Sequence, residues 1–561
     1  MTKEIIKNKK ESQLYIYIIL IIATGITLLP MLLSKPIRGD DYFFHLLRIE
    51  DIKNGLSYGQ FPVNIMSETL YGYGYGNGIF YPDLLLYFAA IIRLFGVSLF
   101  NSYKIFMSVC TLLATFIMYF SARRILKSNN KALYISIFYV FAQYKITDLY
   151  VRAAVGEYLA FIFLPIVILG VYELVYKDYK KWYILTIGMS GIVLSHLLSV
   201  FIVSIMCALL YILNIGKLIK DPKRILYSIL AAITTVLLTS YTLIPIIEQM
   251  ISSKFSVQEV EPFAYNKSTV FKELFTVNTV MIYSLGYVLL FLALIYIFVL
   301  FKKKNRFVTT CFIAGSISFI LTLKTPLLHV ISNNISIYNS IQFAWRLNLI
   351  ATPLLAIAIG YSVDELMPKN INKTIVVILI SIISIIPLMI TVKYIKEKRI
   401  KNIDFTKFTQ NYNAAIGAGE YMPEGASKEK LKKRGSIVTS NDKEFKYDNY
   451  RKKGTLINLD YKVSKDGSYI ELPLLYYKGY TFEITSKDGG EIKEGQATHG
   501  KDMVVRVNLG NIKEGHLKVN YTATTLMKVG DIVTIITLIF MIIYIIKRNR
   551  ENDISILSLH Q

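Results

Sequence analysis

Long apolar runs, separated by short charged segments, cover most of this chain. The first run spans residues 13–33, further runs follow up to residue 392, and a last one spans 529–546. A helix of about 20 apolar residues is long enough to cross the hydrocarbon core of a bilayer. The pattern therefore predicts a polytopic α-helical membrane protein.

The number of spans follows from the length of each run and from the basic residues beside it. Lys and Arg are enriched in cytoplasmic loops, and nearly every basic cluster meets this rule when the N-terminus is cytoplasmic. We therefore predict about twelve transmembrane helices of a cell-membrane protein, with both termini in the cytoplasm. The predicted spans are 13–33, 102–121, 132–146, 155–175, two short spans within 182–213, 225–247, 279–301, 307–324, 341–361, 374–392 and 529–546.

Two segments do not fit an ordinary span. The apolar run 84–95 is too short for a span and contains Arg93. It therefore predicts a helix that lies on the membrane or re-enters it from outside. Residues 182–213 are too many for one span and are interrupted at Ser195-His196, which predicts two short spans meeting on the outer side. A single span there would place the basic residues 302–306 outside.

A polar block at residues 393–526 changes the pattern from helical runs to strand-like alternation. Four alternating segments, separated by glycine-rich turns, predict an extracytoplasmic β-sandwich-like domain. Residues 1–392 then form a membrane domain with a first outer loop at 34–101, and residues 527–561 form a final transmembrane helix and cytoplasmic tail. The alternating segments are 469–473, 480–484, 503–507 and 517–521.

Composition and charge narrow the class of protein. Of the 561 residues, 53% are hydrophobic and only 18% are charged, which is typical of a membrane protein. The net charge of +24 does not indicate nucleic-acid binding, because Lys and Arg lie mostly between the apolar runs. The chain has no phosphate-binding glycine loop, HExxH motif, nucleophile elbow or CxxC pair, so cytosolic nucleotide chemistry has no obvious place.

The segment after the first span carries a group of ionisable residues. In a helix that begins at Asp40, the residues Asp41, His45 and Arg48 fall at positions i, i+4 and i+7 of one face. They would face one space just outside the bilayer, while apolar neighbours such as Leu46 lie against the lipid boundary. The alternative is an N-cap, in which an aspartate satisfies free backbone donors and the other two residues face lipid headgroups. Residue types alone do not decide between the two.

Further polar residues at the outer ends of predicted spans are candidates for substrate binding. Arg152 and Glu157 flank small residues that let a lipid phosphate approach, and a structural ion pair between them is the alternative. Gln342 and Arg346 share a helix face, where a guanidinium suits a phosphodiester and interfacial anchoring is the alternative. A lone histidine such as His196 is more often a hydrogen-bonded packing residue than a ligand.

The loop at residues 71–78 alternates tyrosine with glycine. Tyr73 and Tyr75 are candidates for stacking on sugar rings, because an aromatic face packs well on the apolar face of a sugar. The signal is weak, since the chain contains 41 tyrosines.

Several segments together resemble the GT-C class of multi-span glycosyltransferases, and within it the bacterial YfhO-like group, also described as related to 6-pyruvoyl-tetrahydropterin synthase. The segment Gly39-Asp40-Asp41 resembles the acidic motif that this class places in its first outer loop. Ala344 departs from the pattern, which has Pro there, and the two aspartates leave open which one matches the acid of the family. The run from 81–84 to 94–96 is similar to the surface helices that follow this motif in the GT-C class, and some members also have a β-rich outer domain near the C-terminus. The resemblance to the YfhO-like group rests on 39–41, His45, Arg48, Ala153, 156–160, 195–197, 342–346, 419–423 and 472–480.

The resemblance implies a glycosyltransferase that takes a sugar from an undecaprenyl-phosphate carrier. It would transfer the sugar, outside the membrane, to a cell-envelope acceptor such as teichoic acid. No metal ion is expected, because phosphate already leaves easily; a divalent cation at Asp40, Asp41 and Glu157 is the alternative. The implied catalytic residues are Asp40, Asp41 and His45, and the candidate substrate-binding residues are Arg48, Arg152, Glu157, His196, Gln342, Arg346, Tyr73 and Tyr75.

Two other functions remain open from the sequence. A flippase or transporter of a lipid-linked saccharide predicts ionisable groups at mid-bilayer and internal repeats. The polar residues instead lie at the predicted outer rim, which favours the transferase. A non-catalytic scaffold of an envelope glycosylation system is the other alternative.

Overall fold

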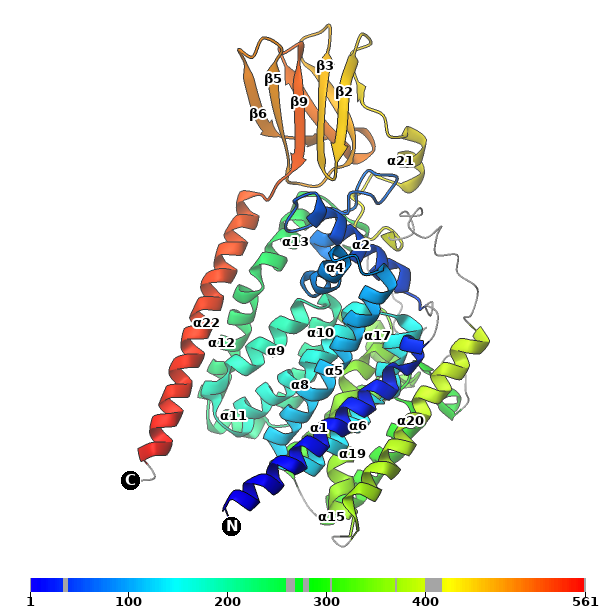
Figure 1. The fold of residues 1–561 in the computed structure, drawn as a ribbon, viewed down its shortest axis with the longest axis vertical. Coiled ribbons are helices and arrows are strands. Elements are labelled where there is room, and N and C mark those ends of the chain that lie inside the picture. The colour runs from blue at the N-terminus through cyan, green and yellow to red at the C-terminus, as the bar shows by residue number, and fades with distance from the viewer. Residues whose placement is uncertain are drawn as a thin grey trace.

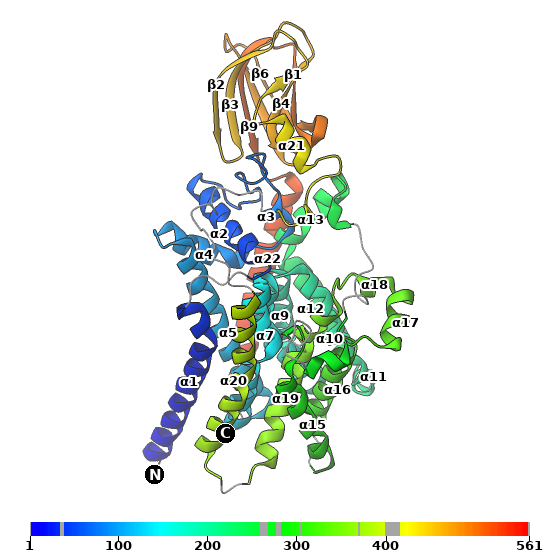
Figure 2. The same cartoon turned by 90° about the vertical axis from the view of Figure 1, so that its right-hand side faces the viewer.

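The computed structural model describes residues 2–33, 39–258, 268–275, 282–302, 305–368, 371–398 and 416–558. They form a helical bundle with two β-sheets at one end (Figures 1 and 2). Helix α1 begins and helix α22 ends at the other end of the bundle, away from the sheets (Figure 1). The predicted domain boundary at residue 392 falls inside α20, and residues 399–415 lie outside the described part.

Six described helices are long and apolar enough to cross a membrane, and a seventh span results if the bent pair of α12 and α13 counts as one. The chain is therefore a multi-pass membrane protein. The count of twelve predicted spans is not confirmed among the described residues, where several apolar runs form shorter helices of 10–17 residues. The six are Gln13–Leu33 of α1 (Thr2–Leu33), α5 (Leu99–Leu126), α8 (Val155–Tyr176), Ala344–Leu366 with α19 (Asn348–Leu366), Ile375–Lys396 of α20 (Lys373–Lys398) and Thr525–Glu551 of α22 (Thr525–Ser558).

Shorter helices complete the bundle. Helices α9 and α10 are separated at residues 194–196, as the interruption at His196 predicted. Helix α12 bends by 72° into α13 where one straight span was predicted. Their bounds are α6 (Asn129–Val140), α7 (Gln143–Thr147), the π-helical turn η2 (Asp148–Arg152), α9 (Tyr183–Val193), α10 (Leu197–Ile212), α11 (Ile215–Lys220), α12 (Lys223–Leu238), α13 (Ser240–Ser252), α15 (Gly286–Lys302), α16 (Arg306–Ile320), α17 (Pro326–Asn334), α18 (Ser336–Asn339) and the 3-10 turn η6 (Ala344–Leu347).

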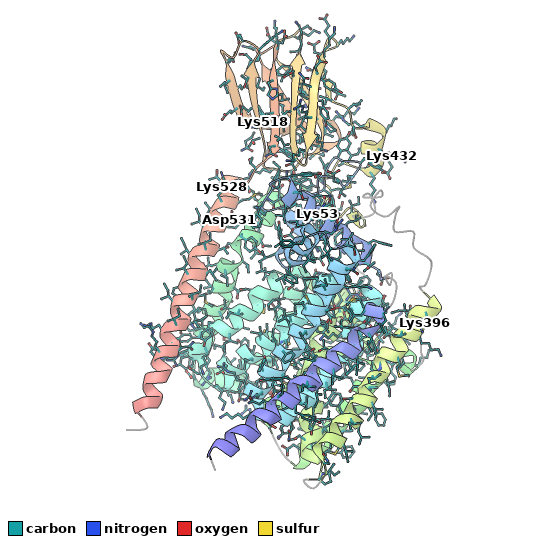
Figure 3. All side chains as sticks on the ribbon, in the orientation of Figure 1. Lys53, Lys396, Lys432, Lys518, Lys528 and Asp531 are labelled. Carbon is teal, nitrogen blue, oxygen red and sulfur yellow. The ribbon has the colours of Figure 1, made fainter. Side chains whose placement is uncertain are left out.

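Charged residues mark the sheet-side ends of two spans. Figure 3 shows Lys396 near the end of α20, and Lys528 and Asp531 near the start of α22. Both positions lie toward the sheets, at the end of the bundle opposite to the start of α1.

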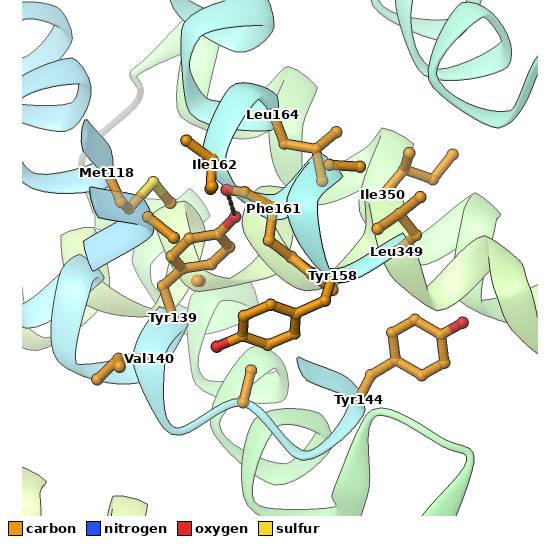
Figure 4. Close-up of a cluster of buried hydrophobic side chains, with 14 of the residues drawn as sticks. Met118, Tyr139, Val140, Tyr144, Tyr158, Phe161, Ile162, Leu164, Leu349 and Ile350 are labelled. Atoms are coloured by element: carbon orange, nitrogen blue, oxygen red, sulfur yellow. Dashed lines mark hydrogen bonds between the residues drawn. The ribbon is translucent and has the colours of Figure 1, made fainter. Parts of the chain in front are cut away.

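Buried tyrosines join the central helices. The hydroxyl of Tyr139 in α6 donates a hydrogen bond to the carbonyl oxygen of Phe161 in α8 at 2.6 Å (Figure 4). Tyr158 of α8 shares a hydrogen bond of 2.8 Å with Thr111 of α5. Because an unpaired hydroxyl is costly in an apolar environment, these bonds favour one fixed packing of the three helices.

A layer of short helices lies between the bundle and the sheets: α2 (Tyr42–Ser57), α3 (Asn77–Phe80), the 3-10 turn η1 (Leu84–Leu86) and α4 (Tyr87–Leu94). The expectation that α2 rests against lipid is wrong, because α4 and α5 pack against it and Leu46 is fully buried. Helix α4 is instead the surface helix. Its Arg93 forms an ion pair of 2.9 Å with Glu50 of α2, while the apolar Phe88 is 47% exposed.

The predicted sandwich is present as two antiparallel sheets with their own apolar core, in the orders β1-β4-β8-β7 and β2-β3-β9-β5-β6. The four alternating segments are confirmed as β4, β5, β8 and β9. Strand β2 was missed, because most of its side chains are exposed and it shows no apolar alternation. The bounds are α21 (Lys428–Arg434), β1 (Thr439–Ser440), β2 (Lys446–Lys453), β3 (Leu456–Lys462), β4 (Ser468–Leu475), β5 (Tyr480–Ser486), β6 (Ile492–Gln496), β7 (Thr498–His499), β8 (Val504–Gly510) and β9 (Glu514–Tyr521).

Candidate functional site

The acidic segment Gly39-Asp40-Asp41 is held against the turn that precedes α8. The backbone N–H groups of the two aspartates donate to the carbonyl oxygens of Val151 and Arg152 at 2.9 and 2.7 Å. A Cβ on residue 39 would lie 2.5 Å from the Cβ of Ala153, so glycine is needed for this close approach. Two segments that are distant in the sequence therefore build one site.

Asp41 is the open acid of this site. It stands at the N-cap of α2, but its side chain makes no capping hydrogen bond, so the N-cap alternative is wrong for this residue. Among the described residues its exposed carboxylate has no hydrogen bond or ion pair. Surrounding protein nevertheless desolvates the carboxylate and raises the pKa of Asp41, and the guanidiniums of Arg152 and Arg346 oppose this shift. An open carboxylate with a raised pKa has the properties of a general base.

Asp40 differs from its neighbour, because its carboxylate accepts a hydrogen bond of 2.8 Å from the hydroxyl of Tyr283. The structure thus separates two acids that the sequence left equivalent. Asp40 contacts the segment before α15, whereas Asp41 faces the cations around α8 and α19.

His45 and Arg48 do not present free groups to the site. Both side chains are 1% exposed, and Nη1 of Arg48 lies 3.3 Å from Nδ1 of His45. Nη2 of Arg48 donates to the carbonyl oxygens of Tyr81 and Pro82 at 3.3 and 2.9 Å. Burial and the neighbouring guanidinium lower the pKa of His45 far below its usual range, so the imidazole is neutral. The two residues hold the turn at Pro82 onto α2, which differs from the catalytic and phosphate-binding roles expected of them.

Arg152 and Glu157 form the ion pair that was the structural alternative. Nη1 of Arg152 lies 2.8 Å from Oε2 of Glu157 and also pairs with Asp148, while the hydroxyl of Tyr144 donates to Oε1 of Glu157 at 2.5 Å. The side chains of Arg152 and Glu157 are 6% and 1% exposed. This buried network fixes the entrance of α8 and leaves Arg152 little freedom to bind a substrate.

Arg346 is the guanidinium with spare donors. Its Nε lies 3.6 Å from Oε2 of Glu157, and its Nη1 donates to Oε1 of Gln342 at 2.9 Å. Within the described residues, Nη2 makes no hydrogen bond. Gln342 is exposed and has a φ of +65°, so a strained backbone aims its amide at Arg346. The two residues meet as their shared helix face predicted, although the local element is a 3-10 turn.

An aromatic wall stands beside these charges. The ring of Trp345 stacks on Phe343 at a centroid distance of 4.8 Å and lies 4.8 Å from the ring of Tyr283. The guanidinium carbon of Arg152 lies 4.6 Å from the centre of the Trp345 ring. Trp345 is therefore part of the site wall.

Tyr81 is a site residue that sequence reasoning missed. Its ring lies 4.1 Å from the guanidinium carbon of Arg48 and 5.7 Å from the ring of His196. A Cβ on Gly156 would lie 2.3 Å from the Tyr81 hydroxyl, so this glycine makes room for the phenol at the entrance of α8. Burial raises the pKa of Tyr81 to about 12, so it stays a hydrogen-bond donor. The signal in the sequence was the pair Tyr81-Pro82, which follows the glycine-rich loop 71–78.

His196 lies at the break between α9 and α10. Its Nδ1 shares a hydrogen bond of 2.9 Å with the hydroxyl of Ser199, and burial lowers its pKa to about 3. These contacts suit the packing alternative. A groove of about 700 Å³, lined almost entirely by apolar atoms, begins beside it at Leu197 and follows one face of α10 to Tyr211, with α9 and α12 as its other walls.

Tyr73 and Tyr75 are not available to stack on a sugar. Both rings are 0% exposed, because they lie in an apolar cluster between the loop and the sheet-bearing segment. The hydroxyl of Tyr73 donates to the carbonyl oxygen of Gly435, and the hydroxyl of Tyr75 accepts from the backbone N–H of Tyr421 at 2.8 Å. The two tyrosines attach the loop to the sheet domain, which corrects the expectation of a sugar platform.

The described residues contain no group of three His, Cys, Asp or Glu side chains placed to hold a metal ion. Asp40, Asp41 and Glu157, the alternative cation ligands, do not form such a group. Asp40 bonds to Tyr283, and Glu157 is occupied by Arg152.

A family of unknown function, DUF6541, matches residues 4–369. The chain belongs to this family. The DUF6541 match contains the acidic segment, the α8 entrance and Arg346, whereas the sheet domain lies beyond it. An uncharacterized protein of Lactococcus lactis subsp. cremoris (strain MG1363) is 25% identical over 280 residues. The alignment covers 48% of this chain and 45% of that relative, so the chain spans less than half the length of the relative.

Two solved structures show a distant likeness. One is ArnT from Cupriavidus metallidurans bound to undecaprenyl phosphate, at a TM-score of 0.42 and 11% identity over 72% of this chain and 74% of that one. The other is the Archaeoglobus fulgidus oligosaccharyltransferase in complex with zinc and sulfate. Its TM-score is 0.42 and its identity 13%, over 74% of this chain and 56% of that one. The resemblance to the YfhO-like group stays a prediction.

Proposed function

We propose that this DUF6541 protein is a membrane glycosyltransferase that uses a polyprenyl-phosphate-linked sugar as its donor. One observation carries the proposal. Among the described residues, Asp41 has an open carboxylate with no side-chain partner and lies close enough to Arg346 for the guanidinium to lower its pKa, and Arg346 in turn acts on His196, beside which the apolar groove begins. A donor made of a sugar, a phosphate and an apolar chain needs these three environments together.

The donor would lie along the groove with its phosphate toward Arg346. The groove volume of about 700 Å³ and its apolar walls suit several isoprene units of a carrier chain. Nη2 of Arg346, which has no hydrogen bond among the described residues, would donate to a phosphate oxygen, a contact that guanidinium groups favour. Tyr81 and Trp345 would border the sugar.

The reaction follows from the positions of these groups. The Asp41 carboxylate takes the proton of an acceptor hydroxyl as its oxygen attacks the anomeric carbon. The bond between that carbon and the phosphate oxygen breaks, and the lipid phosphate leaves with the bonding electrons, stabilised by Arg346. A single open carboxylate suits direct displacement with inversion, because retention needs a second free carboxylate. The acceptor would be a cell-envelope glycan such as teichoic acid.

The test replaces Asp41 by Asn in the purified protein in liposomes, with a panel of labelled polyprenyl-phosphate sugars and cell-envelope polymer as acceptor. We expect Asp41→Asn to lower transfer by about 100-fold or more, because the general base is lost. Asp40→Asn is the matched control and should retain most of the rate. Unchanged transfer by Asp41→Asn at normal protein level would contradict the proposal. Movement of labelled lipid across the bilayer without transfer would identify a transporter instead.

A further inference from the structure

A polar pocket lies at the C-terminal end of α2, the end away from Asp41. It lies between the loop that follows α2 and the edge strand β2. It has a volume of about 350 Å³ and is lined by Tyr58, Glu68, Tyr450, Lys452 and Lys453, with backbone from both sides. Figure 2 shows β2 and β3 directly above α2. The pocket therefore lies between the DUF6541 region and the sheet domain, which are far apart in sequence.

Hydrogen bonds fix both walls of this pocket. Nε2 of Gln60 donates to the hydroxyl of Thr455 at 2.6 Å, and the hydroxyl of Ser436 donates to the carbonyl oxygen of Tyr71 at 3.3 Å. Lys452 donates to the carbonyl oxygen of Gly72 in the loop. Because these bonds join the loop to the sheet domain, the pocket is preformed.

The charges in the pocket are unbalanced. Among the described residues, the ammonium groups of Lys452 and Lys453 have no carboxylate within ion-pair distance, while Glu68 supplies one negative charge. Lys453 is exposed and its Nζ lies 5.9 Å from the centre of the Tyr58 ring. Burial lowers the pKa of Lys452 to about 8, with Glu68 opposing the shift, so it remains largely protonated at neutral pH. The pocket thus favours an anionic ligand.

The tyrosines add a second kind of recognition. Tyr58 and Tyr450 are half-buried, so each is held by packing while part of it stays accessible. The apolar face of a sugar or polyol packs on such a ring, and its hydroxyl groups bond to polar neighbours. Two tyrosines beside two ammonium groups therefore match a saccharide or polyol that carries a phosphate or a carboxylate.

We propose that this pocket binds an anionic oligosaccharide or polyol-phosphate chain and serves as a remote anchor for a polymeric acceptor. Helix α2 connects the anchor to the site, since Asp41 precedes its first residue and Tyr58 follows its last. Its 16 residues give a separation of about 24 Å along the helix axis. A chain held at Tyr58 therefore reaches Asp41 through several of its units. The acceptor role rests on the proposed transferase function, whereas ligand binding in the pocket does not.

Titration calorimetry on the full chain in nanodiscs tests the anchor. The probes are a glycerol phosphate tetramer, tetragalacturonate and neutral maltotetraose. We expect both anionic probes, or one of them, to bind more tightly than maltotetraose, and the one that binds identifies phosphate or carboxylate as the recognised anion. Lys453→Ala should weaken that binding about tenfold, because a hydrogen bond to a charged group is lost. Lys453→Arg should restore most of it.

Lys518→Ala is the matched control, since Lys518 is another exposed lysine of the sheet domain, on β9 (Figure 3). It should leave binding unchanged. Equal affinity of wild type and Lys453→Ala for the anionic probes, or tightest binding of maltotetraose, would overturn the anchor. Asp41→Asn should bind the probes normally. The transfer assay therefore tests the transferase proposal, and calorimetry tests the anchor independently of it.

Discussion

The acidic loop before α2 and the first turn of α8 each bring a carboxylate to the same polar cluster, yet the two groups differ in every contact. Asp41 is exposed and has no side-chain partner among the described residues. Glu157 is 1% exposed and bonds to Arg152 and Tyr144. A buried acid with two partners is committed to holding the fold, whereas an open acid is free to exchange a proton. The comparison separates the scaffold of the site from its reactive group.

The largest expected effect is on stability and comes from the buried acid. Glu157→Ala leaves the Arg152 guanidinium buried with one partner fewer and should lower the free energy of unfolding by about 3 kcal/mol. Asp41→Asn removes no contact and should change it by less than about 0.5 kcal/mol. Thermal unfolding of both variants in detergent measures the difference. Equal loss of stability would remove the distinction between the two carboxylates.

The next effect concerns the contact between the two regions. Gly39→Ala places a Cβ 2.5 Å from the Cβ of Ala153 and should push the acidic loop away from α8. We expect a loss of about 1–3 kcal/mol of stability, together with reduced transfer, because Asp41 moves relative to Arg346. Gly59→Ala is the control for site geometry, since that glycine lies just after α2 and has no atom within 4 Å of an added Cβ. Because its φ is +79°, some strain is expected there too, but no loss of site geometry. Normal transfer by Gly39→Ala would show that the loop need not contact α8.

The smallest effect is on the pH dependence of transfer. The Arg346 guanidinium lowers the pKa of Asp41, so Arg346→Gln should raise it further. Because Asp41 acts as a base only when deprotonated, the acidic limb of the rate profile should move to higher pH, by about 1 unit at most. Arg93→Gln is the control, because it also removes a guanidinium, but one on α4 that forms its ion pair with Glu50 of α2. An acidic limb that stays in place would separate Asp41 from Arg346.

The apolar runs and the strand alternation predicted much of the fold. The membrane helices, the split at His196 and strands β4, β5, β8 and β9 all carry a periodic signal in the sequence. The predicted number of spans is not confirmed in the described residues, because hydrophobicity does not distinguish a short buried helix from a spanning one. The burial of α2 was missed for a related reason, since its apolar face looks the same whether α4 or lipid covers it.

The contacts of the site were predictable where the partners lie close in the sequence and not where they lie far apart. Arg152 with Glu157, and Gln342 with Arg346, meet as their spacing suggested. The roles of Arg48 and Tyr73 could not be predicted, because their hydrogen-bond acceptors, at residues 81–82 and 435, belong to segments farther along the chain. Tyr81 was missed for the same reason.

The sequence alone determined that this chain crosses a membrane repeatedly, that polar residues gather at one end of its helices and that a β-domain follows. Each of these properties depends on residues close together in the chain, whose periodicity is local. Only the tertiary structure decided which acid is open and which is paired. The difference between Asp41 and Glu157 lies in neighbours supplied by distant segments, and these neighbours set the desolvation and charge around each carboxylate.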